Sequence, residues 1–367
     1  MAAGTKLPVT PNGSTNGATS SLPGSVCPVP LTHDEQIVLG HGSGGKLTAQ
    51  LIDRVFLKAF SNPVLDRLDD QAVLQIGSSR LAFTTDAFVV TPLFFPGGDI
   101  GQLAVNGTVN DLAMSGARPV YLAATFILEE GFAMEELRRV VESMREAAMD
   151  AGVQLVAGDT KVVNRGKADK LFISTTGLGV IDRPINISAD RATPGDKIIL
   201  SGFIGDHGMA ILSQRENLEF EGVIESDCEA LHRLVDDMLD VTLDIHCLRD
   251  PTRGGLATVL NEIASRSQIG MMLRADDIPV RDSVRGACEI LGLDPLYVAN
   301  EGKLVAIVAA EAANAIVARM RQNPLGTGAR VIGEVIRDHP GMVLMKTEIG
   351  GTRVLDTLFG EQLPRIC

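Results

Sequence analysis

The chain has 367 residues and a formal net charge of −13, and its residues are 45% hydrophobic but only 4% aromatic. This length suffices for two domains with a substantial core, and the scarcity of aromatic residues favours α/β packing over an aromatic-rich sandwich. The negative charge argues against a general nucleic-acid or anionic-membrane binder, because phosphate contacts need clustered Lys and Arg.

Residues 1–31 predict a disordered extension. They are rich in Pro, Gly, Ser, Thr and Asn, so they carry too little apolar surface to offset the entropy lost on ordering. Regular patterns begin in the rest of the N-terminal half. They predict a hairpin over 71–90, a helix over 101–117, a strand over 119–128, a helix over 134–152, and strands over 154–160 and 171–181.

The C-terminal half alternates similarly after a turn at 193–196. Strands are predicted over 197–202, 295–299, 303–309, 330–336 and 341–347, and helices over 209–216, 226–241, 256–267, 284–293 and 314–322. Mixed strands and helices in both halves predict an α/β (α+β) fold of two domains, each a sheet covered by helices on one side. The predicted boundaries are a domain over 32–183, a second α/β domain over 184–345, and a tail over 346–367 with a short helix.

Two compositional features bear on the compartment. No window supplies about 20 uninterrupted apolar residues, the length of a membrane span, and the N-terminus has no apolar signal-peptide region. The five cysteines are an odd number and contain no CxxC pair, so neither a disulfide framework nor a zinc knuckle is indicated. We therefore expect a cytoplasmic protein whose Cys367, the last residue of the sequence, stays a free thiol.

Aspartates recur where predicted strands end or turns begin. Those that suggest chemistry are Asp70, Asp86, Asp111, Asp159 and Asp250. Mg²⁺ prefers oxygen ligands and bridges one or two carboxylates to phosphates, so several converging carboxylates would indicate an ATP enzyme without a Walker motif. Any single Asp can instead cap a helix or begin a turn, which best explains Asp99. This alternative is weakest for Asp86, because its neighbours in the predicted strand are apolar.

The run DPTRGGLATVLNEIA at 250–264 places an acid, an arginine and two glycines directly before a helix. An acid for a metal, a guanidinium for phosphate and a helix N-terminus together suit a polyphosphate site. A plain helix cap would explain Asp250 but not Arg253 and the glycines as well. The loop HGSGGKL at 41–47 gives a weaker indication, because a flexible turn explains it as well as a nucleotide loop does.

Two polar clusters at element junctions leave alternatives open. His207, in GDHG, suits either acid–base chemistry or a loop position. Glu301, in ANEG between two predicted strands, is by itself best explained as part of a hairpin turn.

Taken in order, these stretches resemble one family. The motifs are LGHGSGGKL, LDDQAVL, FTTDAFVVTPLFFPGGDIGQLAVNGTVNDLAMSGA, FILEEG, VAGDTKVV, GDHGMAIL, RDPTRGGLATVLNEIA, LGLDPLYVANEGK and LPRIC. They are similar to the HypE family, maturation factors that make the cyanide ligands of nickel–iron hydrogenase. The similarity runs from about residue 34 to the end, so the N-terminal extension departs from the family pattern.

The resemblance implies a fold shared with aminoimidazole ribonucleotide synthetase and selenophosphate synthetase, and a homodimer formed through the N-terminal domains. It also implies an ATP- and Mg²⁺-dependent carbamoyl dehydratase, a carbon–oxygen lyase. In such an enzyme the partner HypF carbamoylates the terminal cysteine. The S-carboxamide is then dehydrated to S-cyanide (thiocyanate), and the HypC–HypD complex receives the cyanide for iron.

The same resemblance implies roles for individual residues. Cys367 carries the substrate, and Glu301 and Lys161 are the residues expected to handle protons and stabilise charge. The metal ligands expected are Asp70, Asp86 and Asp250. The nucleotide-site candidates are Gly42, Gly44, Gly45, Asp111, Asp159 and Arg253. Gly360 is the expected hinge of a tail that moves Cys367 between an internal site and an outside partner.

Three other functions are weighed against this one. Selenophosphate synthetase would carry a reactive Cys or selenocysteine near its glycine loop, and here the loop at 41–47 has none. Aminoimidazole ribonucleotide synthetase needs no thiol tail. A scaffold that docks a partner through its tail would show neither ATP turnover nor a mass change on Cys367.

Overall fold

The structure is a computed structural model that describes residues 36–218, 222–360, 363 and 365–367. The chain divides into two compact units, Met1–Val38 and Leu39–Cys367, and the described helices and strands lie in the second. The expected extension over 1–31, including Cys27, lies outside the described residues.

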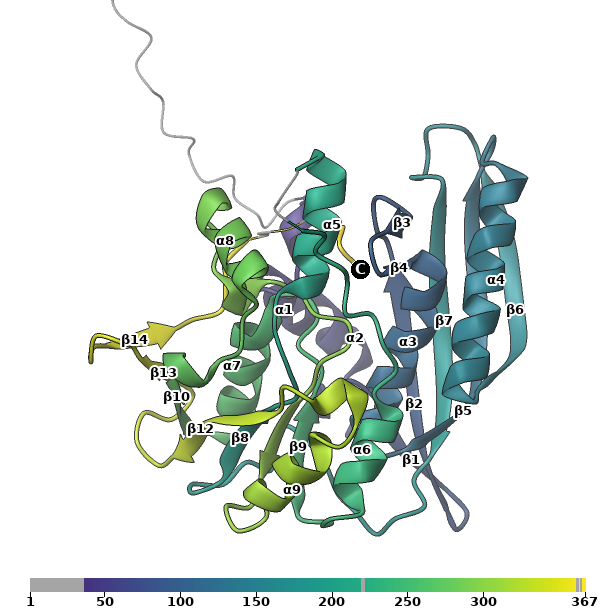
Figure 1. Ribbon diagram of the computed structural model, residues 1–367. Coiled ribbons are helices and arrows are strands. Elements are labelled where there is room, and N and C mark those ends of the chain that lie inside the picture. Colours follow the sequence, from purple (N-terminus) through teal and green to yellow (C-terminus); the bar gives the residue numbers. More distant parts are fainter. Residues whose placement is uncertain (1–35, 219–221, 361–362, 364) are drawn as a thin grey trace, which may run out of the picture. The chain divides into compact units, whose positions relative to one another are not determined.

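A five-stranded sheet forms the first half of this second unit, in the order β1-β2-β7-β5-β6. Its strands are β1 (Ala72–Ile76), β2 (Ser79–Phe88), β5 (Arg118–Glu129), β6 (Gln154–Val163) and β7 (Leu171–Val180). The predicted hairpin is confirmed, because β1 and β2 pair antiparallel with Ile76 opposite Ser79. Helices α3 (Ile100–Ala113) and α4 (Met134–Ala151) cover one face of the sheet (Figure 1). Asp99 caps α3 by accepting from the amides of Gly101 and Gln102, as expected.

The second half is built on a seven-stranded sheet in the order β14-β13-β10-β12-β8-β11-β9. Its strands are β8 (Lys197–Leu200), β9 (Ile245–Arg249), β10 (Gly270–Arg274), β11 (Val305–Val308), β12 (Arg330–Ile336), β13 (Val343–Lys346) and β14 (Thr352–Leu355). Its helices are α5 (Asp206–Glu216), α6 (His232–Leu239), α7 (Gly255–Ser267), α8 (Asp282–Leu291) and α9 (Ala313–Met320).

Helices cover both faces of this second sheet rather than the one face expected. Alternate residues of a strand point to opposite faces. Ile199 of β8 packs in the cluster that contains α6 and α9, whereas its neighbour Ile198 packs in the cluster that contains α7. A third buried cluster joins Phe88 of the first sheet to Met209 of α5, so the two halves share a core.

Three local predictions are wrong. The stretch 295–299, expected as a strand, contains the 3-10 helix η5 (Pro295–Tyr297), because Asp294 caps it by accepting from the amide of Leu296. The helix expected over 226–241 begins only at His232, since the residues before it form a loop tied to Asn110. The described residues of the terminal segment hold the strand β14 but no helix.

A helical stretch comes after the glycine-rich loop, as predicted. It consists of α1 (Lys46–Leu51), the π-helix η2 (Ile52–Leu57) and α2 (Lys58–Phe60), and a 3-10 turn, η3 (Leu65–Arg67), leads to β1. The 3-10 helix η1 (Leu39–Gly42) comes before α1 and ends within the loop. Two more 3-10 turns, η4 (Ala275–Asp277) and η6 (Pro324–Gly326), lie in the second half.

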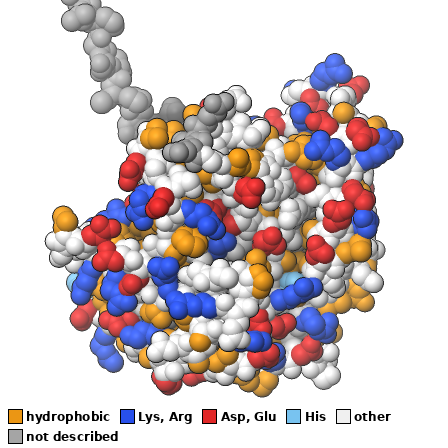
Figure 2. All heavy atoms as spheres, in the orientation of Figure 1, with side chains coloured by type: hydrophobic (Ala, Val, Ile, Leu, Met, Phe, Trp, Pro, Cys, Tyr) orange, Lys and Arg blue, Asp and Glu red, His pale blue; other side chains and the backbone are white. Residues whose placement is uncertain are grey.

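The surface of the described residues carries interspersed charges on one face and exposed apolar side chains on the first sheet. On the face drawn in Figure 2, basic and acidic side chains are interspersed. The first sheet exposes large apolar side chains on β2, β5 and β6, namely Phe83, Tyr121, Ile127, Leu155, Val156 and Val162. Across the described residues, no helix combines the length and the apolar character that crossing a membrane requires.

Candidate active site

A cleft of about 810 Å³ lies where the two halves meet, and most of the residues expected in a site line it. These are Gly44, Gly45, Asp70, Asp86, Asp111, Asp250, Arg253, Glu301 and Cys367. We call it the acidic cleft, after Asp70, Asp86, Asp111 and Asp250. Gly42 lines an adjoining cavity of about 400 Å³, which Arg253 and Cys367 border as well.

The four aspartates reach the cleft from different elements. Asp70 precedes β1, Asp86 lies on β2 between Thr84 and Phe88, Asp111 comes from α3, and Asp250 comes directly after β9. Burial raises the pKa of Asp111 well above its usual value, and repulsion by the neighbouring carboxylates raises it further. Burial likewise raises the pKa of Asp250, with Asp70 and Asp86 adding to the effect. The cleft is therefore built to receive positive charge or to hold protons.

Arg249 partly balances this charge, although the sequence patterns did not single it out. The last residue of β9, it is buried and forms an ion pair with one carboxylate oxygen of Asp70. The other oxygen of Asp70, Oδ2, is buried without a hydrogen-bond partner. Burial raises the pKa of Asp70 to about 6, although Arg249 opposes the rise. The one available signal was the position of Arg249 directly before Asp250 in RDPTRGG.

The aspartates suit an Mg²⁺ ion that is shared with substrate phosphates, and they do not form a complete protein cage. Among the described residues, no group of three or more His, Cys, Asp or Glu side chains is arranged as a ready-made metal cage. Mg²⁺ is usually held by one or two carboxylates together with substrate phosphates, so a complete protein cage is not needed. The unpartnered Oδ2 of Asp70 is one oxygen free for such a role.

The glycine-rich loop packs tightly against two segments that are distant in the sequence. Gly44 has a φ of +79°, and a Cβ there would lie 2.7 Å from the carbonyl oxygen of Arg253. A Cβ on Gly45 would lie 2.5 Å from the carbonyl oxygen of Leu358. The amide of Lys46 donates to that same carbonyl oxygen at 2.8 Å, so the first turn of α1 holds the start of the C-terminal segment.

Glu301 has the environment of a proton-handling group rather than of a turn residue. It lies in the loop before β11, and its side chain is almost fully buried, with Oε1 lacking a partner. Burial raises its pKa well above the usual value, and the charges of Asp250 and Asp86 raise it further. A buried carboxyl with a strongly raised pKa, facing a cleft, suits general acid–base chemistry.

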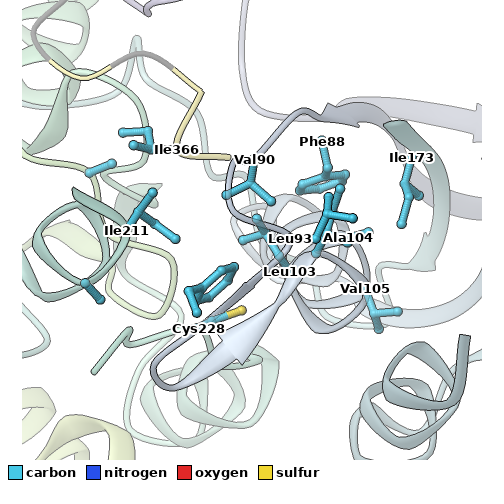
Figure 3. Packing of buried hydrophobic residues seen from close by; sticks show 14 of the residues in the cluster. Phe88, Val90, Leu93, Leu103, Ala104, Val105, Ile173, Ile211, Cys228 and Ile366 are labelled. Carbon is cyan, nitrogen blue, oxygen red and sulfur yellow. The ribbon is translucent and has the colours of Figure 1, made fainter. Parts of the chain in front are cut away.

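Cys367 is docked in this cleft. An oxygen of its terminal carboxylate accepts a hydrogen bond of 2.8 Å from the amide of Val89, just past β2. Ile366 is buried in the cluster that includes Val90 and Ile211 (Figure 3). Burial raises the pKa of the Cys367 thiol to about 12, although Arg253 opposes the rise. In this position the sulfur is neutral.

Two of the expected site residues lie elsewhere. Asp159 and Lys161 are on β6, the edge strand of the first sheet, where both side chains are exposed. They form an ion pair of 2.7 Å with each other, and Lys161 lowers the pKa of Asp159. Neither lines the acidic cleft of its own chain.

Both halves of this chain match domains of a known protein family. Residues 68–181 match the N-terminal domain, and residues 193–345 the C-terminal domain, of AIR synthase related proteins. The carbamoyl dehydratase HypE of Cupriavidus necator is 59% identical over 333 residues, which cover 90% of this chain and 95% of that protein.

Two solved structures are similar in fold and sequence. A hydrogenase maturation protein HypE in complex with ATP has a TM-score of 0.77 and 53% identity, covering 90% of this chain and all of that one. A HypE–HypF complex gives a TM-score of 0.80 and 46% identity, with 84% of this chain and 99% of that chain covered. With such identity over nearly its full length, the chain belongs to the HypE family of carbamoyl dehydratases.

Proposed function

We propose that this chain carries a carboxamide on the sulfur of Cys367 and dehydrates it, with ATP, to a thiocyanate that supplies cyanide for the iron of nickel–iron hydrogenase. The observation that carries the proposal is the position of Cys367, which lines the acidic cleft together with Glu301 and Arg253. A sulfur placed there brings any group attached to it next to a carboxyl, a guanidinium and four aspartates.

The proposed reaction balances without an oxidant or reductant. The amide oxygen of –S–C(=O)–NH₂ accepts the terminal phosphoryl group of ATP, and ADP leaves. The carbon–oxygen bond then breaks with release of phosphate, while the nitrogen loses both of its protons. The product is –S–C≡N with ADP and phosphate.

Glu301 is the proposed base for the nitrogen-bound protons, because burial raises its pKa and makes its carboxylate a stronger base. Arg253 faces Cys367, and its charge interacts with Asp86 and Glu301. We assign it to charge balance at the amide oxygen and the phosphate, for which a guanidinium is well suited. The glycine loop and Asp111 are assigned to the nucleotide.

The acidic cleft is also the proposed site of the cation that accompanies ATP. Asp70, Asp86 and Asp250 would hold Mg²⁺ together with the phosphates, where its charge would neutralise theirs. In the nucleotide-free chain burial raises the pKa of all three carboxyls, and neighbouring carboxylates add to the rise at Asp70 and Asp250.

The neutral state of the docked sulfur separates two stages of the proposed cycle. Carbamoylation needs a nucleophilic thiolate, which burial disfavours at the docked position. The carboxamide and the thiocyanate have no thiol proton to lose, so both can occupy that position without the cost of a buried charge. We therefore assign carbamoylation by HypF, and cyanide transfer to HypC–HypD, to an undocked tail in the cytoplasm.

In a homodimer, Asp159 and Lys161 could act in the proposed reaction although they lie outside the cleft of their own chain. The exposed side chains of Phe83, Tyr121 and Ile127 lie on one face of the first sheet, and a second copy would cover that face. Since Lys161 lies outside the cleft of its own chain, its proposed role in proton transfer requires that it act in the site of a second copy.

The deciding experiment weighs the peptide that contains Cys367. The full chain is incubated with HypF, carbamoyl phosphate and ATP, and then with ATP replaced by a non-hydrolysable analogue. A gain in mass by one carboxamide, followed by loss of one water only with hydrolysable ATP, supports the proposal. A carboxamide that keeps its water in both reactions would leave a scaffold or carrier instead of a dehydratase.

A further inference from the structure

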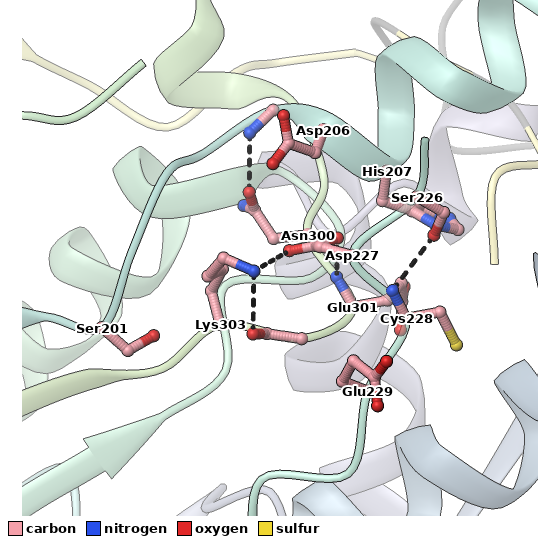
Figure 4. A network of polar contacts seen from close by, with 12 residues as sticks. Ser201, Asp206, His207, Ser226, Asp227, Cys228, Glu229, Asn300, Glu301 and Lys303 are labelled. Atoms are coloured by element: carbon pink, nitrogen blue, oxygen red, sulfur yellow. Dashed lines mark hydrogen bonds and ion pairs between the residues drawn. The ribbon is translucent and has the colours of Figure 1, made fainter. Parts of the chain in front are cut away.

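His207 contacts both the segment that ends in Cys367 and a loop that binds the backbone of Glu301. It stands in the first turn of α5, and its side chain is completely buried. The Nε2 atom lies 2.5 Å from the carbonyl oxygen of Ile366, the residue that precedes Cys367. The Nδ1 atom lies 2.8 Å from the hydroxyl of Ser226 (Figure 4).

A neutral His207 with its proton on Nε2 satisfies all of these contacts. A carbonyl oxygen can only accept, so Nε2 must carry a proton and donate it to Ile366. Burial lowers the pKa of His207, which favours the neutral ring, and Nδ1 is then an acceptor. Ser226 donates its hydroxyl proton to Nδ1, and its oxygen accepts from the amide of Cys228 at 3.2 Å.

The loop that contains Ser226 and Asp227 binds both His207 and Glu301. Asp227, the next residue after Ser226, accepts from the backbone amide of Glu301 at 3.0 Å through Oδ1. Its other oxygen forms a buried ion pair of 2.9 Å with Lys303. A short loop therefore fixes the imidazole on one side and the proposed base on the other (Figure 4).

Among the described residues of the tail tip, Cys367 and Arg365 accept backbone hydrogen bonds from the first half. The amides of Val89 and Thr91, in the first half, donate to a terminal carboxylate oxygen of Cys367 and to the carbonyl oxygen of Arg365. His207, in the second half, takes the carbonyl oxygen between them. The tip of the tail is thus held from both sides, and His207 is its polar contact with the half that contains Glu301.

The geometry points to His207 as a positioning residue: through Nε2 it fixes the peptide between Ile366 and Cys367, so that the group on the sulfur is aligned with Glu301. This rests on the proposed dehydration for its consequence in catalysis, but the docking it describes can be measured without any reaction. Ser226 supports it by keeping Nε2 the protonated nitrogen.

Alkylation of Cys367 measures the docking directly. The full chain with Cys27→Ser, free of nucleotide, is treated with iodoacetamide, and the rate of modification of each cysteine peptide is followed by mass spectrometry. Cys228, Cys247 and Cys288 are buried and serve as internal reporters of folding. The docked thiol is only partly buried, but its raised pKa leaves little reactive thiolate, so the rate at Cys367 rises with the undocked population.

Three variants separate the hydrogen bond from bulk packing. His207→Leu removes the donor, and we expect the rate at Cys367 to rise about fivefold, which corresponds to about 1 kcal/mol. His207→Gln can place an amide donor near Nε2 and should return the rate toward wild type. Ser226→Ala should raise the rate by a smaller factor, and it still tests the proposal if His207→Leu fails to fold. The control is His246→Gln. His246 is a partly buried histidine on β9, and its replacement should leave the alkylation rate at Cys367 unchanged.

The outcomes either support the proposal or overturn it. Faster alkylation of Cys367 in His207→Leu, together with a rate near wild type in His207→Gln, supports the proposal. An unchanged alkylation rate in both His207→Leu and Ser226→Ala overturns the proposal. So does an equal rise of that rate in His207→Leu and His207→Gln. In the dehydration assay, His207→Leu should lower the maximal rate about 10- to 100-fold with an unchanged half-saturating ATP concentration, because misalignment slows the reacting step. If the wild type itself removes no water, the proposed function fails while the alkylation rates still decide the role of His207.

Discussion

The backbone amide of Val89 donates a hydrogen bond of 2.8 Å to a terminal carboxylate oxygen of Cys367. Val89 comes directly after β2, the strand that also carries Asp86. The end of one strand therefore places both an acidic residue and the reactive cysteine at the cleft. Residues far apart in the sequence meet because the segment after β14 returns across the glycine loop to the first half.

Gly45→Ala should loosen this return path. A Cβ at Gly45 would lie 2.5 Å from the carbonyl oxygen of Leu358, so the backbone that leads to Cys367 must shift. We expect alkylation of Cys367 to become roughly tenfold faster, equivalent to about 1.4 kcal/mol of lost docking energy. The matched control is Gly286→Ala on α8, where a Cβ meets nothing within 4 Å. Equal alkylation rates in the two variants would show that the contact with Leu358 does not hold the tail.

Glu301→Gln should slow dehydration while leaving nucleotide binding intact. The substitution keeps the size of the side chain but removes the proton acceptor, and a general base contributes typically about 10²- to 10⁴-fold. The measurement is the rate of water loss from carbamoylated Cys367, with ATP affinity determined separately. Glu311→Gln, at an exposed acid near β11, is the control and should react at the wild-type rate. A normal rate in Glu301→Gln would remove the residue from proton transfer.

The sequence identified most of the acidic cleft because strand ends carry recognisable residues. Asp86 stood out as an acid within an apolar strand, and Asp250 as part of DPTRGG. Both contribute to the cleft. Arg249 did not stand out, because only the folded chain places it against Asp70 across 179 residues of sequence.

Other features depend on tertiary contacts that no local pattern encodes. The residues after 226 have a helical pattern, but the side chain of Asn110 binds the backbone of Glu229 and Leu231, and this segment forms a loop instead. His207 was left with two explanations, because its partner Ile366 is 159 residues away. The exposure of Lys161 arises from the place of β6 at the sheet edge, which its own sequence does not reveal.

Asp111→Asn should stabilise the nucleotide-free chain and flatten its dependence on pH. Burial and neighbouring carboxylates raise the pKa of Asp111 well above 3.8, and burial raises that of Asp70 to about 6. Between the unfolded and the folded pKa the folded state binds more protons, so the free energy of unfolding falls as pH rises through this window. Each unit of raised pKa costs about 1.4 kcal/mol once the group must ionise. The amide can still accept from Thr84, whose hydroxyl donates to Asp111 at 2.8 Å.

Denaturant unfolding in EDTA, from about pH 4 to pH 8, tests this expectation. The wild type should lose stability across the range, and Asp111→Asn should lose less and be the more stable protein at pH 8. Asp182→Asn is the control, because Asp182 is exposed and paired with Arg118 at the surface. Stability that is independent of pH in the wild type would contradict the raised pKa values.

Lys161 can be assigned to its own site or to that of a second copy by mixing two inactive variants. Lys161→Ala lacks the proposed proton carrier, and Cys367→Ala lacks the sulfur. If Lys161 acts in the site of the other copy, a mixed dimer has one complete site: the Cys367 of one chain with the Lys161 of its partner. Random mixing makes half of the dimers mixed, so the recovered activity should be about one quarter of the wild-type value. Mixing Glu301→Gln with Cys367→Ala is the control and should stay inactive, because Glu301 and Cys367 line the same cleft of one chain. Activity in Lys161→Ala alone, or none in its mixture, would overturn the assignment across two copies.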